Sequence, residues 1–169
     1  MDDLSQFDFV SEQTAENYRR LFEMAAGTEI HYLPNKFKGR GIVICSGGPK
    51  LFPSTWASVN LLRRHGCTLP IEIWYLGEEE MPTEFRDLLA SVSGELRLVD
   101  GRSHPRATKS TTGWQLKAFA IIYSSFEEVL FLDADNIAVA DPEYLFESAN
   151  YKIHGATFWP DYGRFHRSL

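Results

Sequence analysis

Short apolar runs alternate with helical segments along this chain, and this alternation constrains the fold more than any other feature of the sequence. The first run covers residues 41–45 and is closed by a Ser-Gly-Gly-Pro turn at residues 46–49. A continuous apolar run of this length suits a strand that is buried on both faces, as strands of parallel sheets are. Three further runs rich in apolar residues predict strands at residues 71–76, 95–99 and 129–132.

Helical periodicity fills the intervals between these strands. Residues 54–65 place apolar side chains at helical spacing, end in basic residues, and are followed by Gly66, a favoured residue type after a helix. Thr83 can cap a second helix that continues through Leu89, and residues 113–123 predict a third. Strands that alternate with helices in this way predict the α/β class, with a Rossmann-type, mostly parallel sheet flanked by helices on both faces.

Weaker patterns lie outside this alternation. Residues 11–25 predict an amphipathic helix near the N-terminus, and a short helix is expected to begin at residues 141–142, an Asp-Pro pair. Residues 155–159 predict a late strand that Pro160 stops. The chain contains no internal repeat and no linker rich in Pro, Gly or Ser, so these segments belong to one domain.

Length and charge narrow the classes of function. A chain of 169 residues is long enough for a single domain with a sizeable core. We expect residues 1–38 to form a helical lead-in and residues 39–169 to form the ligand-binding body. The formal net charge is −6, so the chain offers no overall positive field to a phosphate backbone, and we expect no nucleic-acid partner.

Cysteine content and hydropathy bear on the cellular compartment in which the protein is expected. Cys45 and Cys67 are too few for a disulfide framework and lack the spacing of a zinc site, so we expect buried thiols. No apolar run approaches the ~20 residues that a membrane span requires. The acidic N-terminus lacks the regions of a secretory signal. By composition alone we expect a soluble chain, cytoplasmic as written.

The turn after the first strand is the first candidate for ligand contact. In an open parallel sheet, ligands bind beyond the carboxyl ends of the strands. Ser46, Gly47 and Gly48 follow the first predicted strand, and the absence of two side chains would let a ligand approach backbone N–H groups. A tight turn with no ligand explains the same residues, because the glycine spacing matches neither phosphate-loop fingerprint.

Two carboxylates follow the fourth predicted strand. If the segment stays extended, Asp133 and Asp135 point to one side and Ala134 to the other. Two hard oxygen ligands on one side suit Mg²⁺ or Mn²⁺ held together with substrate phosphates. A solvated acidic loop is the alternative, since like charges also coexist where water screens them.

Lys117 is the single charged residue of a predicted helix that is apolar nearly all round. Such a helix is expected to be buried, and a buried ammonium group needs an anion. Three arrangements satisfy this requirement. The stem extends so that the ammonium reaches water, the ammonium meets Asp133 and Asp135, or it meets a phosphate of a bound ligand.

A third carboxylate is a further candidate for ligand contact. Asp161, after the break at Pro160, is either a turn residue or a contact to an acceptor or sugar.

The acidic pair after an apolar strand also resembles the first motif of haloacid-dehalogenase-type phosphatases. Ile137 departs from that pattern, and too few residues follow Asp135 for the remaining phosphatase motifs.

A broader resemblance joins these segments. The chain resembles, over about residues 39–163, a mannosyltransferase family of GT-A-fold glycosyltransferases related to fungal Golgi alpha-mannosyltransferases. Each shared motif is weak alone, but all occur in the family's order. The similar segments are residues 39–45 with 47–48, 61–63 with 66–70, 113–117, 132–136 with 141–142, and 158–161.

The resemblance implies a metal-dependent glycosyltransferase. It implies transfer of a sugar, mannose from GDP-mannose, to a glycan hydroxyl with retention of configuration. In this scheme Asp135 binds Mn²⁺ (or Mg²⁺), and Asp133 contacts the metal or the donor. Lys117 lies near the diphosphate, and the Ser46-Gly47 loop meets the nucleotide. The partners are then a nucleotide-sugar donor and a glycan acceptor, and a trimmed family member would come from the Golgi lumen.

Family members usually continue beyond the Trp-Pro-Asp segment at residues 159–161. We therefore expect the chain to be truncated at its C-terminus relative to the family. The alternative function is then a catalytically incomplete nucleotide-binding fragment or an interaction module. A missing region would also leave apolar surface exposed, which predicts self-association.

Overall fold

The computed structural model describes residues 16, 19, 20, 37–107 and 113–158. Contacts divide the chain into two compact units, residues 1–36 and residues 37–169. In the first unit, Arg19 and Arg20 donate to the carboxylate of Glu16 over N–O distances of 2.6 and 3.3 Å. These three residues are helical; the rest of the helix predicted at residues 11–25 lies outside the described residues.

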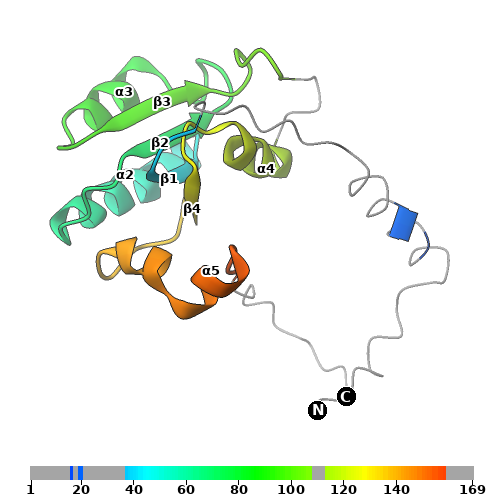
Figure 1. Cartoon of the computed structure of the whole chain (residues 1–169). Coiled ribbons are helices and arrows are strands. Elements are labelled where there is room, and N and C mark those ends of the chain that lie inside the picture. Colours follow the sequence, from blue (N-terminus) through cyan, green and yellow to red (C-terminus); the bar gives the residue numbers. More distant parts are fainter. Residues whose placement is uncertain (1–15, 17–18, 21–36, 108–112, 159–169) are drawn as a thin grey trace, which may run out of the picture. The chain divides into compact units, whose positions relative to one another are not determined.

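A four-stranded parallel sheet forms the second unit (Figure 1). Its spatial order is β3-β2-β1-β4, and every neighbouring pair runs parallel. The predicted α/β class and the mostly parallel sheet are therefore confirmed. The strands are β1 Arg40–Cys45, β2 Ile71–Tyr75, β3 Leu96–Asp100 and β4 Glu128–Asp133.

Helices cover both faces of this sheet. Residues 42 and 44 of β1 face α2 and α3, while residues 43 and 45 face α4, because side chains alternate along a strand (Figure 1). A short 3-10 helix and a last helix follow β4. The helices are α2 Gly48–Arg64, α3 Thr83–Ala90, α4 Trp114–Tyr123, the 3-10 helix η2 Pro142–Glu147 and α5 Ala149–His154.

The two faces are packed unequally. On the α2 and α3 face, Ile42 and Ile73 of the sheet pack with Val59 of α2 in a large cluster of buried side chains. On the α4 face, Val43 and Trp74 pack with few buried residues of the helix. Since each buried side chain adds about 1.5–3 kcal/mol, most of the hydrophobic stabilisation comes from the first face.

Helix starts differ from the prediction in two places. α2 begins at Gly48, six residues earlier than predicted, and contains Pro53. Pro53 lies in the second helical turn, where its missing N–H removes one backbone hydrogen bond without ending the helix. Thr83 is the first residue of α3 and not its cap, since Pro82 holds the capping position with no side-chain hydrogen bond.

The predicted late strand is wrong for its described part. Ser148 caps α5, accepting a hydrogen bond from Tyr151 N at 3.3 Å, and the helix ends at Gly155 with φ of 70°. Residues 156–158 have no regular structure, and Trp159 lies outside the described residues. Gly155 adopts the left-handed conformation that commonly ends a helix, so it belongs to the end of α5 and does not begin a strand.

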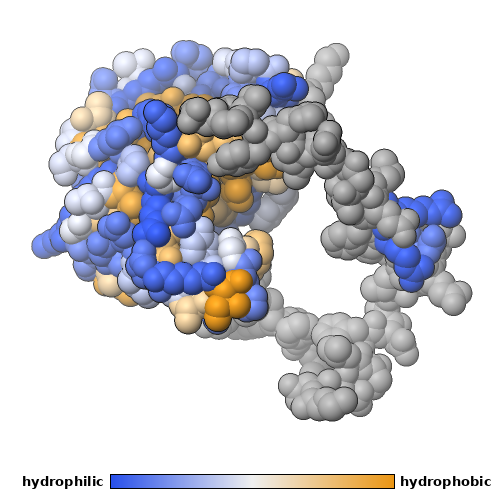
Figure 2. Space-filling model, in the orientation of Figure 1, coloured by the Kyte–Doolittle hydropathy of each residue, from blue (hydrophilic) through white to orange (hydrophobic). Residues whose placement is uncertain are grey.

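The expectation that α4 is buried all round is also wrong. Leu116 and Ala120 are its buried residues, whereas Trp114 is 82% exposed and Ile122 is 61% exposed. The sheet covers only one side of this helix, so an apolar sequence is left facing outward. Figure 2 shows another hydrophobic group at the end of the fold where α5 lies, and Ile153 of α5 is 73% exposed. Self-association through such surface stays a prediction.

Among the described residues, no helix combines the length and the apolar character needed to cross a membrane.

Candidate functional site

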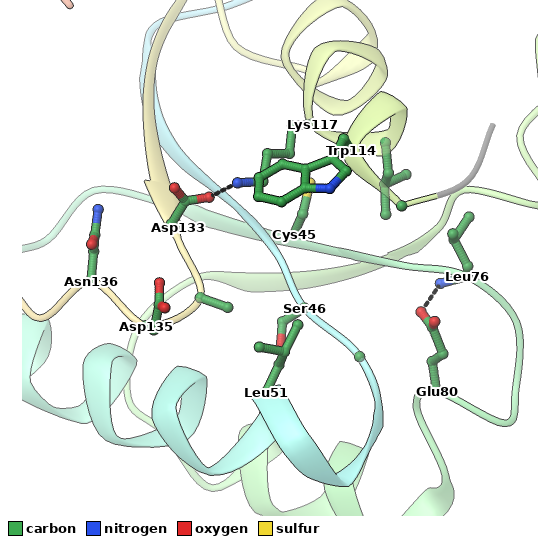
Figure 3. Close-up of a pocket in the computed structure, with 14 residues that line it drawn as sticks. Cys45, Ser46, Leu51, Leu76, Glu80, Trp114, Lys117, Asp133, Asp135 and Asn136 are labelled. Atoms are coloured by element: carbon green, nitrogen blue, oxygen red, sulfur yellow. Dashed lines mark hydrogen bonds and ion pairs between the residues drawn. The ribbon is translucent and has the colours of Figure 1, made fainter. Parts of the chain in front are cut away.

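A pocket of about 620 Å³ lies at the carboxyl edge of the sheet (Figure 3). β1 and β4 are neighbours there although they are distant in sequence, because the chain turns from β1 toward β2 on one side and returns as β4 on the other. Such switch points are where open α/β sheets bind ligands. The lining residues are Cys45, Ser46, Gly47, Leu51, Leu76, Glu80, Gly113, Trp114, Leu116, Lys117, Asp133, Ala134, Asp135 and Asn136.

The acidic pair lies at this pocket, but for a different reason from the one predicted. Asp133 ends β4 beside Cys45 of β1. Asp135 belongs to a turn in which Asn136 N donates to Asp133 O at 2.9 Å, so the segment is not extended. Ala134 packs into the core on the α2 side and anchors this turn. Asp133 is half-buried and Asp135 is exposed, and both line the pocket.

Of the predicted pairing of Lys117 with Asp133 and Asp135, the structure shows the contact with Asp133. Lys117 Nζ donates to Asp133 Oδ1, and Figure 3 shows this contact beside the Trp114 ring. The Nζ atom lies 4.4 Å from the centre of the Trp114 ring and 5.8 Å from that of Phe131. The ammonium is therefore held by one carboxylate and by aromatic faces that attract cations.

Carboxylates outnumber cations around the pocket. Its charged lining residues are Lys117 against Asp133, Asp135 and Glu80, a formal charge of −2. The Oε2 atom of Glu80 accepts a hydrogen bond from Leu76 N at 2.8 Å. An anionic ligand would be repelled by this lining unless a cation accompanied it.

Two residues of the Ser-Gly-Gly turn line the pocket, and the third begins a helix. Ser46 lines the pocket although it is only 3% exposed, and its Oγ accepts from Thr55 Oγ1 at 2.6 Å. Gly47 also lines the pocket, and a Cβ at this position would collide with the side chain of Glu80. Gly48 is not among the lining residues, because it begins α2 and its N–H donates to Glu80 O at 2.8 Å.

Cys45 adds a thiol to the floor of the pocket. Burial raises the pKa of this thiol to about 12. The sulfur is then protonated near neutral pH, and a protonated thiol is neither a good nucleophile nor a metal ligand. Cys67 is fully buried, and burial raises the pKa of its thiol as well. The prediction of two buried thiols therefore holds for Cys67 and in part for Cys45, which is half-buried.

Sequence reasoning missed two polar or aromatic residues of the site. Glu80 ends a run of three glutamates that matches no functional motif, but the turn after β2 brings it to the pocket. Trp114 precedes Lys117 by three residues, and this helical spacing was the available signal that both share a face. Asp161, the predicted acceptor or sugar contact, lies outside the described residues.

The acidic pair fits a hard divalent cation only when a ligand completes the coordination. Within the described part of the chain, no group of three or more His, Cys, Asp or Glu residues could hold a metal ion. Asp133 and Asp135 supply two carboxylates. Mg²⁺ and similar ions are commonly bound by one or two carboxylates together with substrate phosphates and water. The pair is therefore compatible with a metal that arrives with a phosphate ligand.

Several known proteins are similar to this chain. The chain is 34% identical to alpha-1,2-mannosyltransferase MNN24 of Candida albicans over 77% of this chain and 18% of that protein. It is 37% identical to MNN21 of the same organism, over 75% of this chain and 20% of that protein. It is 29% identical to MNN5 of Saccharomyces cerevisiae, over 92% of this chain and 28% of that protein. The chain thus spans about a fifth to a quarter of the length of these relatives.

One solved structure and one family also match. The apo structure of the bifunctional glycosyltransferase WbbM aligns with a TM-score of 0.47 and 21% identity, over 69% of this chain and 22% of that chain. The family described as "Mannosyltransferase putative" matches residues 39–168, which include every strand and the whole pocket. By that match, this chain is a member of the mannosyltransferase family.

Proposed function

We propose that the protein transfers mannose from GDP-mannose to a hydroxyl of a glycan acceptor, with retention of configuration and with Mn²⁺ or Mg²⁺. Membership of the family and the names of the relatives support mannosyl transfer. The pocket at the switch point of the sheet is of a size that suits a small ligand. Because the family match covers the acidic pair, we do not pursue the phosphatase alternative.

The observation that carries the proposal is the charge of the pocket. A nucleoside diphosphate is strongly anionic, and the lining has a formal charge of −2. We therefore expect binding to depend on a cation that offsets the charge of the carboxylates. Asp133 and Asp135 are the residues that would hold it. When bound, such an ion acts as a Lewis acid that stabilises negative charge on the departing diphosphate.

The remaining residues bind and orient the donor. Lys117 Nζ would supply a charged donor for phosphate oxygens, and Ser46 and Gly47, which line the pocket, would contact the nucleotide. In the reaction the bond between the mannosyl anomeric carbon and the phosphate oxygen breaks. A bond to the acceptor oxygen forms, the acceptor proton passes to the departing diphosphate or to water, and GDP leaves. We assign no side-chain nucleophile, and Asp161 stays a predicted acceptor contact.

Calorimetry of the full chain tests the donor site. We expect GDP and GDP-mannose, but not UDP, to bind in the presence of Mn²⁺ and to lose their binding in chelator. Asp135→Ala should abolish this binding. Asp87→Asn is the control, because it removes an exposed carboxylate of α3 that does not line the pocket. Binding that is unchanged by chelator or by Asp135→Ala would contradict the metal-dependent site.

A nucleotide-binding fragment without catalytic activity is the second candidate. It is favoured by the lining of the pocket, in which Asp133, Asp135 and Lys117 suit donor binding and no described side chain is assigned as a nucleophile. Turnover separates the two functions. Release of GDP from GDP-mannose, in transfer to a mannose-containing acceptor or in slow hydrolysis, supports the transferase. Metal-dependent binding with no release supports the fragment.

A further inference from the structure

We propose that Lys117 exchanges partners when the donor binds, and that this exchange makes metal binding and nucleotide binding mutually dependent. In the free chain the ammonium occupies Asp133; with donor present it moves to the diphosphate and leaves Asp133 for the cation. This inference rests on the proposed function, because it concerns the same site. It adds a positioning role for Lys117 that precedes any chemistry.

The free arrangement is visible in Figure 3. Lys117 Nζ bonds Asp133 Oδ1 and lies over the Trp114 ring at 4.4 Å. Asp135 is exposed on the other side of the turn, and it lines the same pocket. The ammonium therefore takes one of the two carboxylates that would hold a metal. A cation that approached alone would meet one open carboxylate and one already paired.

Electrostatics make this pairing costly for a metal on its own. A dication beside Asp133 would be repelled by the ammonium that already neutralises that carboxylate. The diphosphate removes the conflict, because it offers the ammonium a new anion and offers the metal new oxygen ligands. Nucleotide binding should therefore raise the affinity for the metal, and metal binding should raise the affinity for the nucleotide by the same factor.

The lysine is built to move without the backbone. It lies in the first turn of α4, its side chain is 29% exposed, and its four-carbon stem is flexible. Lys117 and Asp133 both line the pocket, and Nζ lies 4.4 Å from the centre of the Trp114 ring. A rotation about the bonds of the stem can therefore move Nζ away from Asp133 within the same pocket. No change in the fold is required.

Opposite changes in two affinities test the exchange. Mn²⁺ binding is measured on the full chain by the loss of the free-ion electron paramagnetic resonance signal, with and without GDP. We expect Lys117→Met to bind Mn²⁺ alone about tenfold more tightly than the wild type, within the range of typical couplings. We expect the same variant to bind GDP with Mn²⁺ about tenfold more weakly. Lys152→Met is the control for net charge, since Lys152 pairs with Glu147 outside the pocket.

The signs of the changes distinguish the possible failures. If Lys117 stayed on Asp133 in the bound state, its removal would strengthen Mn²⁺ binding with and without GDP, and the exchange would be wrong. Unchanged Mn²⁺ affinity beside normal GDP binding would also overturn the exchange while leaving the proposed function intact. If neither protein bound Mn²⁺ or GDP, the proposed function would fail and the exchange with it.

Discussion

Charged side chains are paired differently at the amino edge of the sheet and in the pocket at its carboxyl edge. At the amino edge, Arg40 begins β1 and bonds Glu128, its neighbour in β4, at 2.8 Å and Glu147 at 2.6 Å. Glu147 also accepts from Lys152 at 2.6 Å. Two cations therefore meet two carboxylates. These contacts raise the pKa of Arg40 and lower the pKa of Glu147, as expected for groups that stabilise each other's charge.

A second arginine reinforces the amino edge. Arg63, in the last turn of α2, donates to four backbone carbonyls in the segments that lead into β2 and β3. Each bond is between 2.7 and 3.0 Å long. The acceptors are the carbonyl oxygens of Cys67, Leu69, Ser93 and Glu95.

The pocket at the carboxyl edge has no such balance, although Arg102 pairs with Glu79 elsewhere at this edge. Lys117 meets one carboxylate there, and the pocket keeps a formal charge of −2. Charges at the amino edge hold loops and strands together, whereas the carboxylates that line the pocket exceed the single ammonium there and can interact with a ligand. Substitutions at the first edge should therefore change folding stability, and substitutions at the second should change binding.

The largest effect on stability is expected at Arg63. Arg63→Met keeps an apolar stem but leaves four carbonyls without their charged donor, so we expect the free energy of unfolding to fall by about 2–4 kcal/mol. Urea denaturation measures this change. The exposed neighbour Arg64 provides the control, and Arg64→Met should change little. Equal effects of the two variants would show that the amino edge is not stabilised in the way described.

A smaller effect, on binding, is expected at Trp114. Trp114→Leu removes the aromatic face under Lys117 and part of the pocket wall. We expect nucleotide binding in the presence of Mn²⁺ to weaken by about 1 kcal/mol, or roughly fivefold, with no loss of stability. Trp56→Leu is the matched control, because Trp56 does not line the pocket. If Trp114→Leu bound the nucleotide as tightly as the wild type, Trp114 would have no role in binding.

The smallest change is expected in the stability of the ligand-free chain after Asp135→Ala. Removing one of two neighbouring like charges relieves repulsion, so the free energy of unfolding should stay within about 0.5 kcal/mol of the wild type or rise slightly. Thermal unfolding without metal or nucleotide checks this. A marked loss of stability would mean that Asp135 serves the fold, as the charges of the amino edge do.

Much of the fold could be predicted from local sequence. The apolar run at residues 41–45 became β1, residues 129–132 form the middle of β4, and Gly66 follows α2 with φ of 88°. These features depend on burial and on backbone preferences that each segment carries itself. The turn at Asp135 and the outward side of α4 could not be predicted, because each depends on what packs against the segment.

The sequence by itself determined the strands, the helices between them and the positions of Asp133 and Asp135 after the last strand. Only the tertiary structure decided that Glu80 joins them, that Lys117 pairs with Asp133 and that Gly48 turns away into α2. The physical reason is that these contacts join segments distant in the chain. Their distances are set by the order of the strands and by packing across the sheet, which no local pattern encodes.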